Sequence, residues 1–162
     1  MATLTQGTIF RQTASVTVGN TTTETTVAST GVGSLVIPAN TLAVGAAFRI
    51  TVIGTYDRAT GTLTLRSKFG ATTFCSTSAA SPGAGNNTSF LLRIDGTVRT
   101  AGAGGTLFSN GYFIGVSPLP TTNTATTALD TTVANTLDIS CQWSAVAAAN
   151  TMTVQIITFE LL

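Results

Sequence analysis

Histidine is absent from this 162-residue chain, and its absence removes much of enzyme chemistry. Histidine is the commonest general base near neutral pH and the commonest metal ligand. Serine triads, Cys–His dyads and His-based zinc sites are therefore excluded. The single lysine, Lys68, lies between Ser67 and Phe69 in an alternating strand pattern. This position indicates a solvated strand residue and not the base of a Ser–Lys pair.

Charge of either sign is scarce, since charged residues make up 8% of the chain against about 25% in an ordinary soluble domain. A glycosidase needs two carboxylates that face each other across a cleft. Asp57 and Asp95 are predicted at turns or strand ends, and Asp130 is predicted to cap a turn before Thr131. The glycine-rich segments 31–33 and 102–105 miss the spacing of a phosphate-binding loop. We therefore expect no catalytic residue, no cofactor, no metal ion and no enzymatic activity.

The formal net charge is +1. This charge gives neither the basic surface that binds nucleic acid nor the polybasic patch that binds a membrane surface, so we expect neither partner. A membrane-spanning helix needs about 20 nearly continuous apolar residues. The most apolar segments, 41–53 and 114–119, are interrupted by polar residues, glycine or proline. The first six residues also lack the basic and apolar regions of an export signal.

Cysteine occurs only twice, as Cys75 and Cys141, with no second cysteine near either. Their separation fits neither a zinc ribbon nor a CxxC redox pair. We expect two buried free thiols. The alternative is a single disulfide, which the missing export signal disfavours.

Threonine is abundant, at about one residue in five. Its β-branched side chain suits a pleated strand and gives that strand a polar face without charge. A hydroxyl-covered surface with so few charges has little self-repulsion to keep molecules apart. Such a surface is typical of a protein that is permanently associated with copies of itself or with other subunits.

Alternation with a period of two dominates the chain, and helical periodicity is nearly absent. The clearest strand is 136–143, whose inward face includes Trp143, so we expect this tryptophan in the core. Strands over 48–56 and 63–69 are predicted to form a hairpin through the Asp- and Gly-containing segment 57–61. Gly54 is predicted to mark a bulge or bend in the first of them. Further strands are predicted at 15–18, 22–28, 34–37, 72–76, 88–95, 106–116 and 152–161.

Segment 152–161 is apolar on both faces in its middle, which predicts a central strand or one that faces a neighbouring subunit. The Ala-rich segment 144–149 lacks capping residues and is predicted to be a loop. Segments rich in structure-breaking residues are expected to connect the strands, at 38–40, 81–87, 101–105 and 118–123.

Eight to ten strands in the length of one domain predict an all-β fold, a single antiparallel jelly-roll-like sandwich. We assign residues 31–162 to this jelly-roll domain. Residues 1–30 are polar and rich in threonine. They are either an extended N-terminal arm that docks on a neighbour or an edge strand of the same domain.

Arg49 and Arg66 are the candidate interface residues. If they lie on the outer faces of paired strands, they can form ion pairs with carboxylates of a neighbouring subunit. The alternative is that both are ordinary exposed strand arginines.

Two segments of the chain resemble tailed-bacteriophage virion proteins. The first is GSLVIPANTLAVG at 33–45, which continues through Phe48 to Tyr56, and the second is LDISCQWS at 137–144, followed by NTMTV at 150–154. In that family an IPAN-TL-GD segment leads into a long strand, and an LD-T-QW strand lies near the end. Ala46 stands where the family pattern usually has an acidic residue. The resemblance covers residues 24–162.

This resemblance implies a single jelly roll, commonly a homotrimer, in a virion assembled in the host cytoplasm, with no catalytic residues to carry over. We therefore expect a capsid decoration (cement) protein that stabilises the phage head through trimeric packing. Its partners would be copies of itself and the major capsid protein or another virion protein. One alternative is the receptor-binding head of a tail fibre or baseplate. Another is a carbohydrate-binding β-sandwich module, which would need an exposed Trp or Tyr.

Overall fold

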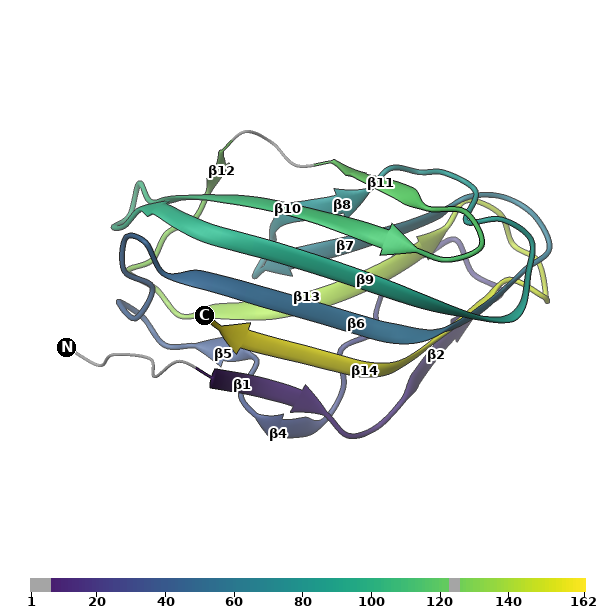
Figure 1. Ribbon diagram of the computed structural model, residues 1–162, viewed down its shortest axis with the longest axis horizontal. Helices are drawn as coiled ribbons and strands as arrows, with labels where there is room; N and C mark the ends of the chain where they lie inside the picture. The colour runs from purple at the N-terminus through teal and green to yellow at the C-terminus, as the bar shows by residue number, and fades with distance from the viewer. Residues whose placement is uncertain (1–6, 123–125) are drawn as a thin grey trace.

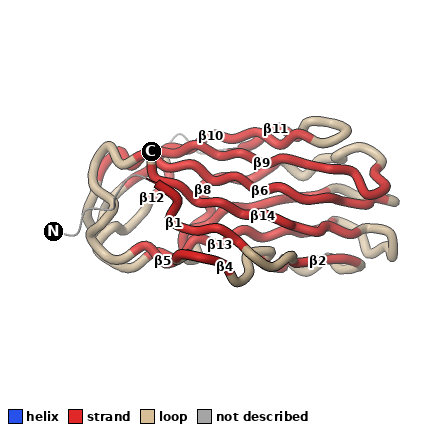
Figure 2. Tube along the Cα trace, turned by 60° about the horizontal axis from the view of Figure 1, so that its bottom comes forward, coloured by secondary structure: helices blue, strands red, loops and turns tan. Residues whose placement is uncertain are grey.

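The computed structural model describes residues 7–122 and 126–162, and every regular element in these residues is a β-strand. The strands run lengthwise and the loops gather at two ends (Figure 2). The strands are β1 (Gly7–Gln12), β2 (Val16–Gly19), β3 (Thr25–Thr26), β4 (Gly31–Gly33), β5 (Val36–Ile37), β6 (Ala47–Arg58), β7 (Leu63–Phe69), β8 (Thr72–Thr77), β9 (Gly85–Thr100), β10 (Thr106–Ile114), β11 (Leu119–Thr122), β12 (Thr127–Ala128), β13 (Asn135–Trp143) and β14 (Thr151–Leu161). A helix long and apolar enough to cross a membrane does not occur in this part of the chain.

The strands form two layers that face each other (Figure 1). One, which we call the β6 layer, has the order β4-β1-β14-β6-β9-β10, and the other, the β7 layer, has the order β3-β13-β7-β8. β11 joins the layers by pairing with both β10 and β8. Along the chain, β6 is followed by β7, β9 follows β8 and β14 follows β13, so the chain passes repeatedly from one layer to the other. With β1 beside β14 and all pairings antiparallel, this is the predicted jelly-roll-like sandwich.

The predicted hairpin between 48–56 and 63–69 is wrong. β6 pairs with β14 and β9, whereas β7 pairs with β13 and β8, so residues 59–62 cross from one layer to the other. Asp and Gly mark a change of chain direction but do not choose the pairing partner. The apolar faces of β6 and β7 are both buried, and they meet across the sandwich instead of lying side by side in one layer.

The core between the layers follows the predicted alternation. Phe48 of β6 packs edge-on against Phe69, Phe74 and Phe159, with ring centroids 5.6, 5.8 and 6.0 Å away. Gly96 of β9 lies against the Phe48 ring, and a Cβ atom there would come within 2.3 Å of Phe48 Cζ. Only glycine at this position leaves room for the ring that joins the two layers.

β14 is a central strand of the β6 layer, with β6 on one side and β1 and β2 on the other. It contains a β-bulge opposite Gly54, because the register passes from Val154 to Ile156 and leaves Gln155 as the extra residue. The irregularity predicted at Gly54 is therefore present, but the additional residue is in the partner strand. After the bulge Ile156 points outward and Ile157 points into the core.

The N-terminal segment contributes strands to the jelly roll within the described residues. β1 and β2 pair with β14, and β3 pairs with β13, so these short strands lie toward the edges of the layers. Residues 1–6 of the predicted arm lie outside the described residues. The segment 118–123 was expected to be a connection, but it contains strand β11. Pro118 and Pro120 do not prevent this short strand from pairing with β8 and β10.

Asn150 fixes two loops at the end of the sandwich where β6 crosses to β7. Its side chain is fully buried, and its Oδ1 accepts hydrogen bonds from the backbone N–H groups of Ala59 and Thr60. Its Nδ2 donates to the backbone oxygens of Thr60 and Ala145. The segment 144–149 is a loop, as predicted.

Candidate interaction surfaces

The outer face of the β6 layer carries a continuous apolar row. Ile156, Ile53, Leu91 and Ile114 are successive cross-strand partners on β14, β6, β9 and β10. Ile53 and Ile156 keep 39% and 40% of their surface exposed, and Ile114 keeps 52%. We call these four residues the apolar row. Their side chains lie on solvent-facing strand positions, where an ordinary sandwich has polar residues.

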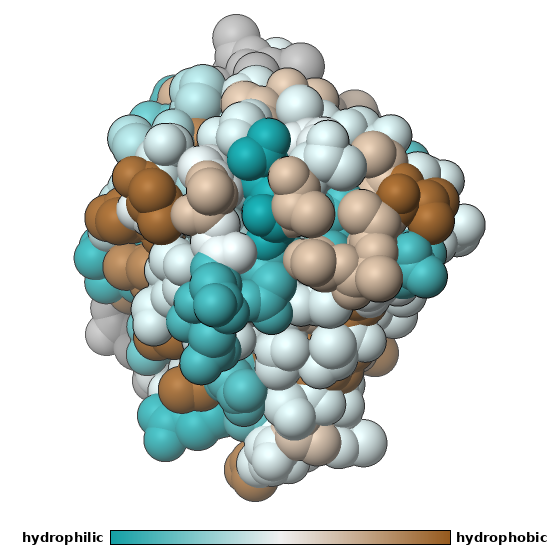
Figure 3. Space-filling view, turned by 90° about the vertical axis from the view of Figure 1, so that its right-hand side faces the viewer, coloured by the Kyte–Doolittle hydropathy of each residue, from teal (hydrophilic) through white to brown (hydrophobic). Residues whose placement is uncertain are grey.

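Hydroxyl groups border the apolar row. The next row on one side contains Thr153, Thr55 and Ser89, and the next row on the other contains Thr158, Thr51, Arg93 and Tyr112. Exposed apolar side chains also occur elsewhere, among them Val44, Val116 and Val146. The end-on view in Figure 3 shows brown groups separated from one another by pale and teal surface. The apolar row differs from these groups because strand pairing aligns its four members.

Charges near the apolar row cancel within the chain. Arg49 Nε donates to Asp95 Oδ1 at 2.8 Å, and Arg93 Nε donates to Asp95 Oδ2 at 3.2 Å. Glu160 is the cross-strand partner of Arg49 on the other side. Asp95 was predicted at a turn or strand end, and this prediction is wrong, because it lies well inside β9, which runs from Gly85 to Thr100. Two arginines and two carboxylates leave this band without net charge, so a second molecule would not be repelled.

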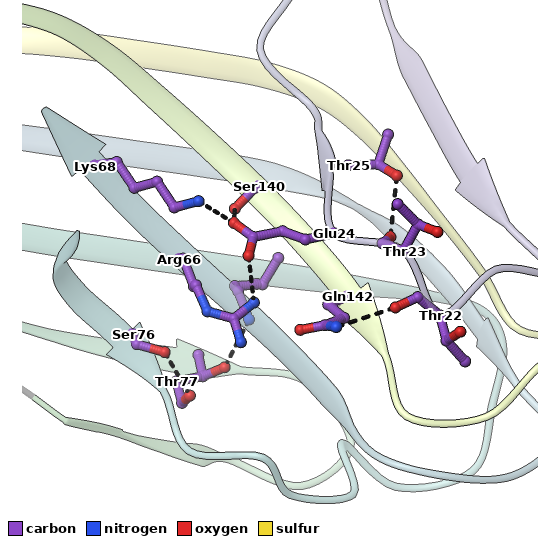
Figure 4. Close-up of polar contacts among 11 residues, drawn as sticks. Thr22, Thr23, Glu24, Thr25, Arg66, Lys68, Ser76, Thr77, Ser140 and Gln142 are labelled. Carbon is purple, nitrogen blue, oxygen red and sulfur yellow. Dashed lines mark hydrogen bonds and ion pairs between the residues drawn. The ribbon is translucent and has the colours of Figure 1, made fainter. Parts of the chain in front are cut away.

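A polar cluster centred on Glu24 occupies the outer face of the β7 layer (Figure 4). Glu24 Oε1 accepts from Lys68 Nζ and, at 2.6 Å, from Ser140 Oγ, while Glu24 Oε2 lies 3.2 Å from Arg66 Nη1. Glu24 directly precedes β3, whereas Lys68 and Arg66 are on β7 and Ser140 is on β13. The hydrogen bond from Lys68 is the largest of the influences that lower the pKa of Glu24, followed by that from Ser140. The cluster therefore ties the N-terminal segment to the β7 layer.

A shallow groove of about 290 Å³ lies beside this cluster, toward the loop end of β7 and β13. Its polar lining residues are Thr22, Thr62, Thr64, Arg66, Gln142 and Ser144. Thr64 and Gln142 are direct cross-strand partners. Figure 4 shows the Arg66 guanidinium and the Gln142 amide on the same face of the layer. The groove is richer in hydrogen-bonding side chains than the hollow lined by Thr8, Arg11, Val32 and Gly33.

The two candidate interface arginines lie on different layers. Arg49 is on β6 and Arg66 is on β7. These strands are not paired, so the expectation that the two arginines lie on paired strands is wrong. Both do lie on outer faces, half-buried, and both form ion pairs within the chain, with Asp95 and Glu24. Contact of either arginine with another subunit stays a prediction. Of the two, Arg49 is the nearer to the apolar row, two rows away along β6.

The remaining predicted residues have structural surroundings. Cys75 and Cys141 are both buried and free, as predicted. Burial raises the pKa of Cys75 to about 11 and that of Cys141 to about 12. Asp130 Oδ1 accepts from the Thr132 N–H at 2.8 Å and so caps the predicted turn. Trp143 is 0% exposed, as predicted, and cannot serve as a sugar-stacking platform.

The sequence patterns predicted the apolar row and the Glu24 cluster only in part. The alternation along each strand shows which side chains point outward, but aligning Ile53 with Leu91 requires the order and register of the strands. Glu24, one of the six acidic residues, had no assigned role, and no spacing in the sequence joins it to Lys68. The doubly apolar middle of 152–161 was the one available indication of the row. No family model matches the chain, and searches of curated proteins and of solved structures found no match.

Proposed function

We propose that this protein is a structural subunit of a tailed-phage virion, a capsid decoration protein that works as a homotrimer and not as an enzyme. The observation that carries the proposal is the apolar row on the outer face of the β6 layer. Copies of the chain, or the major capsid protein, would cover this row in the particle.

The apolar row supports association because removing it from water is favourable. Complete burial of an isoleucine side chain contributes about 1.5–3 kcal/mol. Ile53 and Ile156 still expose 39% and 40% of their surface, so covering each would contribute about 0.6–1.2 kcal/mol. The neighbouring hydroxyls and the cancelled charges add little repulsion. An interface of this kind holds through shape and apolar contact, and many copies on one particle would multiply its effect.

The first experiment measures the oligomer. Sedimentation equilibrium at micromolar concentration should give three times the subunit mass for the unchanged protein. The double variant Ile53→Thr/Ile156→Thr keeps β-branched side chains but removes apolar surface from the row, and we expect its dissociation constant to rise about tenfold or more. Val32→Thr is the matched control, because Val32 is an exposed β-branched residue on β4, outside the row. A wild-type monomer at these concentrations would overturn the assembly proposal.

A second experiment tests the place in the virion. If the chain is produced by a phage, quantitative mass spectrometry of purified particles should find hundreds of copies per particle. A dozen or so copies would place it in the tail and would favour the receptor-binding alternative.

A further inference from the structure

The groove on the outer face of the β7 layer has hydrogen-bonding groups that the described part of the chain leaves unused. The hydroxyls of Thr22, Thr62 and Thr64 have no hydrogen-bond partner among residues 7–122 and 126–162. Gln142 Nε2 donates to the Thr22 backbone oxygen at 3.0 Å, which leaves its Oε1 as an open acceptor. Such groups can both donate to and accept from a polyhydroxylated molecule.

Arg66 adds a charged donor to the same groove. A guanidinium carries five N–H donors, and the one ion pair of Arg66 in the described chain is with Glu24 Oε2 at 3.2 Å. Its Nη1 is buried and has no hydrogen bond of good geometry there. Because Nη1 is buried against Glu24, a ligand in the groove would meet the part of the guanidinium that remains exposed there.

The lining is held in place before any ligand arrives. Thr64 and Gln142 are paired across β7 and β13, and Arg66 follows two residues along β7 on the same face. Glu24 holds Arg66 and is itself held by Lys68 and Ser140. A site whose groups are already positioned loses less entropy on binding.

The local charge favours an anion. Among the groups in direct contact, Glu24 is shared by two cations, Arg66 and Lys68, which leaves an excess of one positive charge. The carboxylate of Asp138, the cross-strand partner of Lys68, accepts a hydrogen bond from Thr26 and does not line the groove. A carboxylate in the groove would therefore meet Arg66 beside Glu24, whose negative charge Lys68 also offsets.

We propose that the groove binds a single carboxylate-bearing sugar unit. Arg66 contacts the carboxylate, while the threonine hydroxyls and the Gln142 amide contact the ring hydroxyls. The volume of about 290 Å³ is close to the lower limit of ligand clefts, about 300 Å³, and suits one ring. The groove offers no exposed aromatic platform, so the affinity is weak. This site is independent of the apolar row and of the proposed assembly role.

The test is a titration of the full chain followed by two-dimensional NMR, with glucuronic acid as the probe. Glucose tests the ring without the carboxylate, and acetate tests the carboxylate without the ring. We expect millimolar binding of glucuronic acid and at least fivefold weaker binding of the other two. Thr64→Val, which removes one hydroxyl and keeps the Glu24 cluster, should weaken binding about three- to tenfold. Arg66→Gln should weaken it more than tenfold.

Thr55→Val is the matched control, because Thr55 is a half-buried outward threonine on the other layer, and it should leave binding unchanged. Three results would overturn the proposal. They are no shift at 20 mM glucuronic acid, acetate binding as tight as glucuronic acid binding, and unchanged affinity in a folded Thr64→Val variant. None of these results depends on the oligomeric state.

Discussion

At the scale of single residues, burial decides the chemistry of the two cysteines. Cys75 and Cys141 are 2% and 0% exposed. Desolvation disfavours the thiolate, so it raises both pKa values well above the ordinary value of 9.0. A thiol that stays protonated and out of contact with solvent is a poor nucleophile. These cysteines therefore act as core residues.

The reactivity of the thiols gives a direct check. Native protein at pH 8 should not react with Ellman's reagent over an hour, whereas protein unfolded in guanidinium chloride should show two reactive thiols. The unfolded chain loses its thiol protons near pH 9, before the folded chain does at about pH 11 and 12. The free energy of unfolding should therefore fall as pH rises above about 9. A Cys75→Ala/Cys141→Ala variant should lose this part of the pH dependence, and rapid native labelling would contradict the assignment.

At the scale of elements, a two-residue strand is kept in place by a charge cluster. β3 makes few backbone pairs, with Thr26 opposite Ser140 and Thr25 opposite Cys141. Glu24 adds contacts to Lys68, Arg66 and Ser140 just before this strand. Short edge strands of this kind depend on side-chain contacts because their own hydrogen bonds are too few.

Acid should weaken this connection. The pKa of Glu24 is lowered by its partners, so its contribution to stability is complete above the unfolded pKa of about 4.5 and is lost as pH falls through the lower folded value. Glu24→Gln should reduce the free energy of unfolding at pH 7 by about 0.5–1.5 kcal/mol, since Glu24 is about one third exposed and partly screened. The difference from wild type should shrink at pH 3 in urea titrations. Glu160→Gln, on the other layer, is the control and should change stability by less than about 0.5 kcal/mol.

Elements also show where sequence patterns succeed and fail. The faces of 48–56, 63–69 and 136–143 were predicted from alternation, because a strand with one buried side needs apolar residues at every second position. The hairpin between the first two was wrong, since a short Asp/Gly segment can end a strand in either layer. Strand β11 was missed because prolines at 118 and 120 are typical of connections. Pairing partners distant in sequence decide such cases.

At the scale of the whole molecule, the surface has many hydroxyls and few charges. The charged residues are 8% of the chain, and Arg49 and Arg66 on the outer faces form ion pairs within the chain, with Asp95 and Glu24. An interface made with such a surface depends on apolar contact and not on opposite charge. Salt screens charges within about 10 Å at 0.1 M, but it does not weaken apolar burial.

Self-association should therefore tolerate salt. We expect the dissociation constant of the oligomer to change less than about threefold between 0.05 and 0.5 M sodium chloride, or to decrease. Sedimentation velocity at both salt concentrations measures this directly. If the oligomer dissociates in 0.5 M salt, charge pairs between subunits hold it together. That result would contradict the apolar interface and would support the prediction that Arg49 forms an ion pair with a neighbouring subunit.

The sequence by itself determined the all-β class, the inward faces of the long strands, the burial of Trp143 and the two thiols, and the scarcity of charge. Each of these depends on residue type and on spacing of a few positions, which local sequence records. The tertiary structure alone decided the layer order, the crossing from β6 to β7, the alignment of the apolar row and the meeting of Glu24 with Lys68 and Arg66. These join residues many positions apart, and the energy that brings them together comes from packing two sheet faces over one core, which no short segment contains.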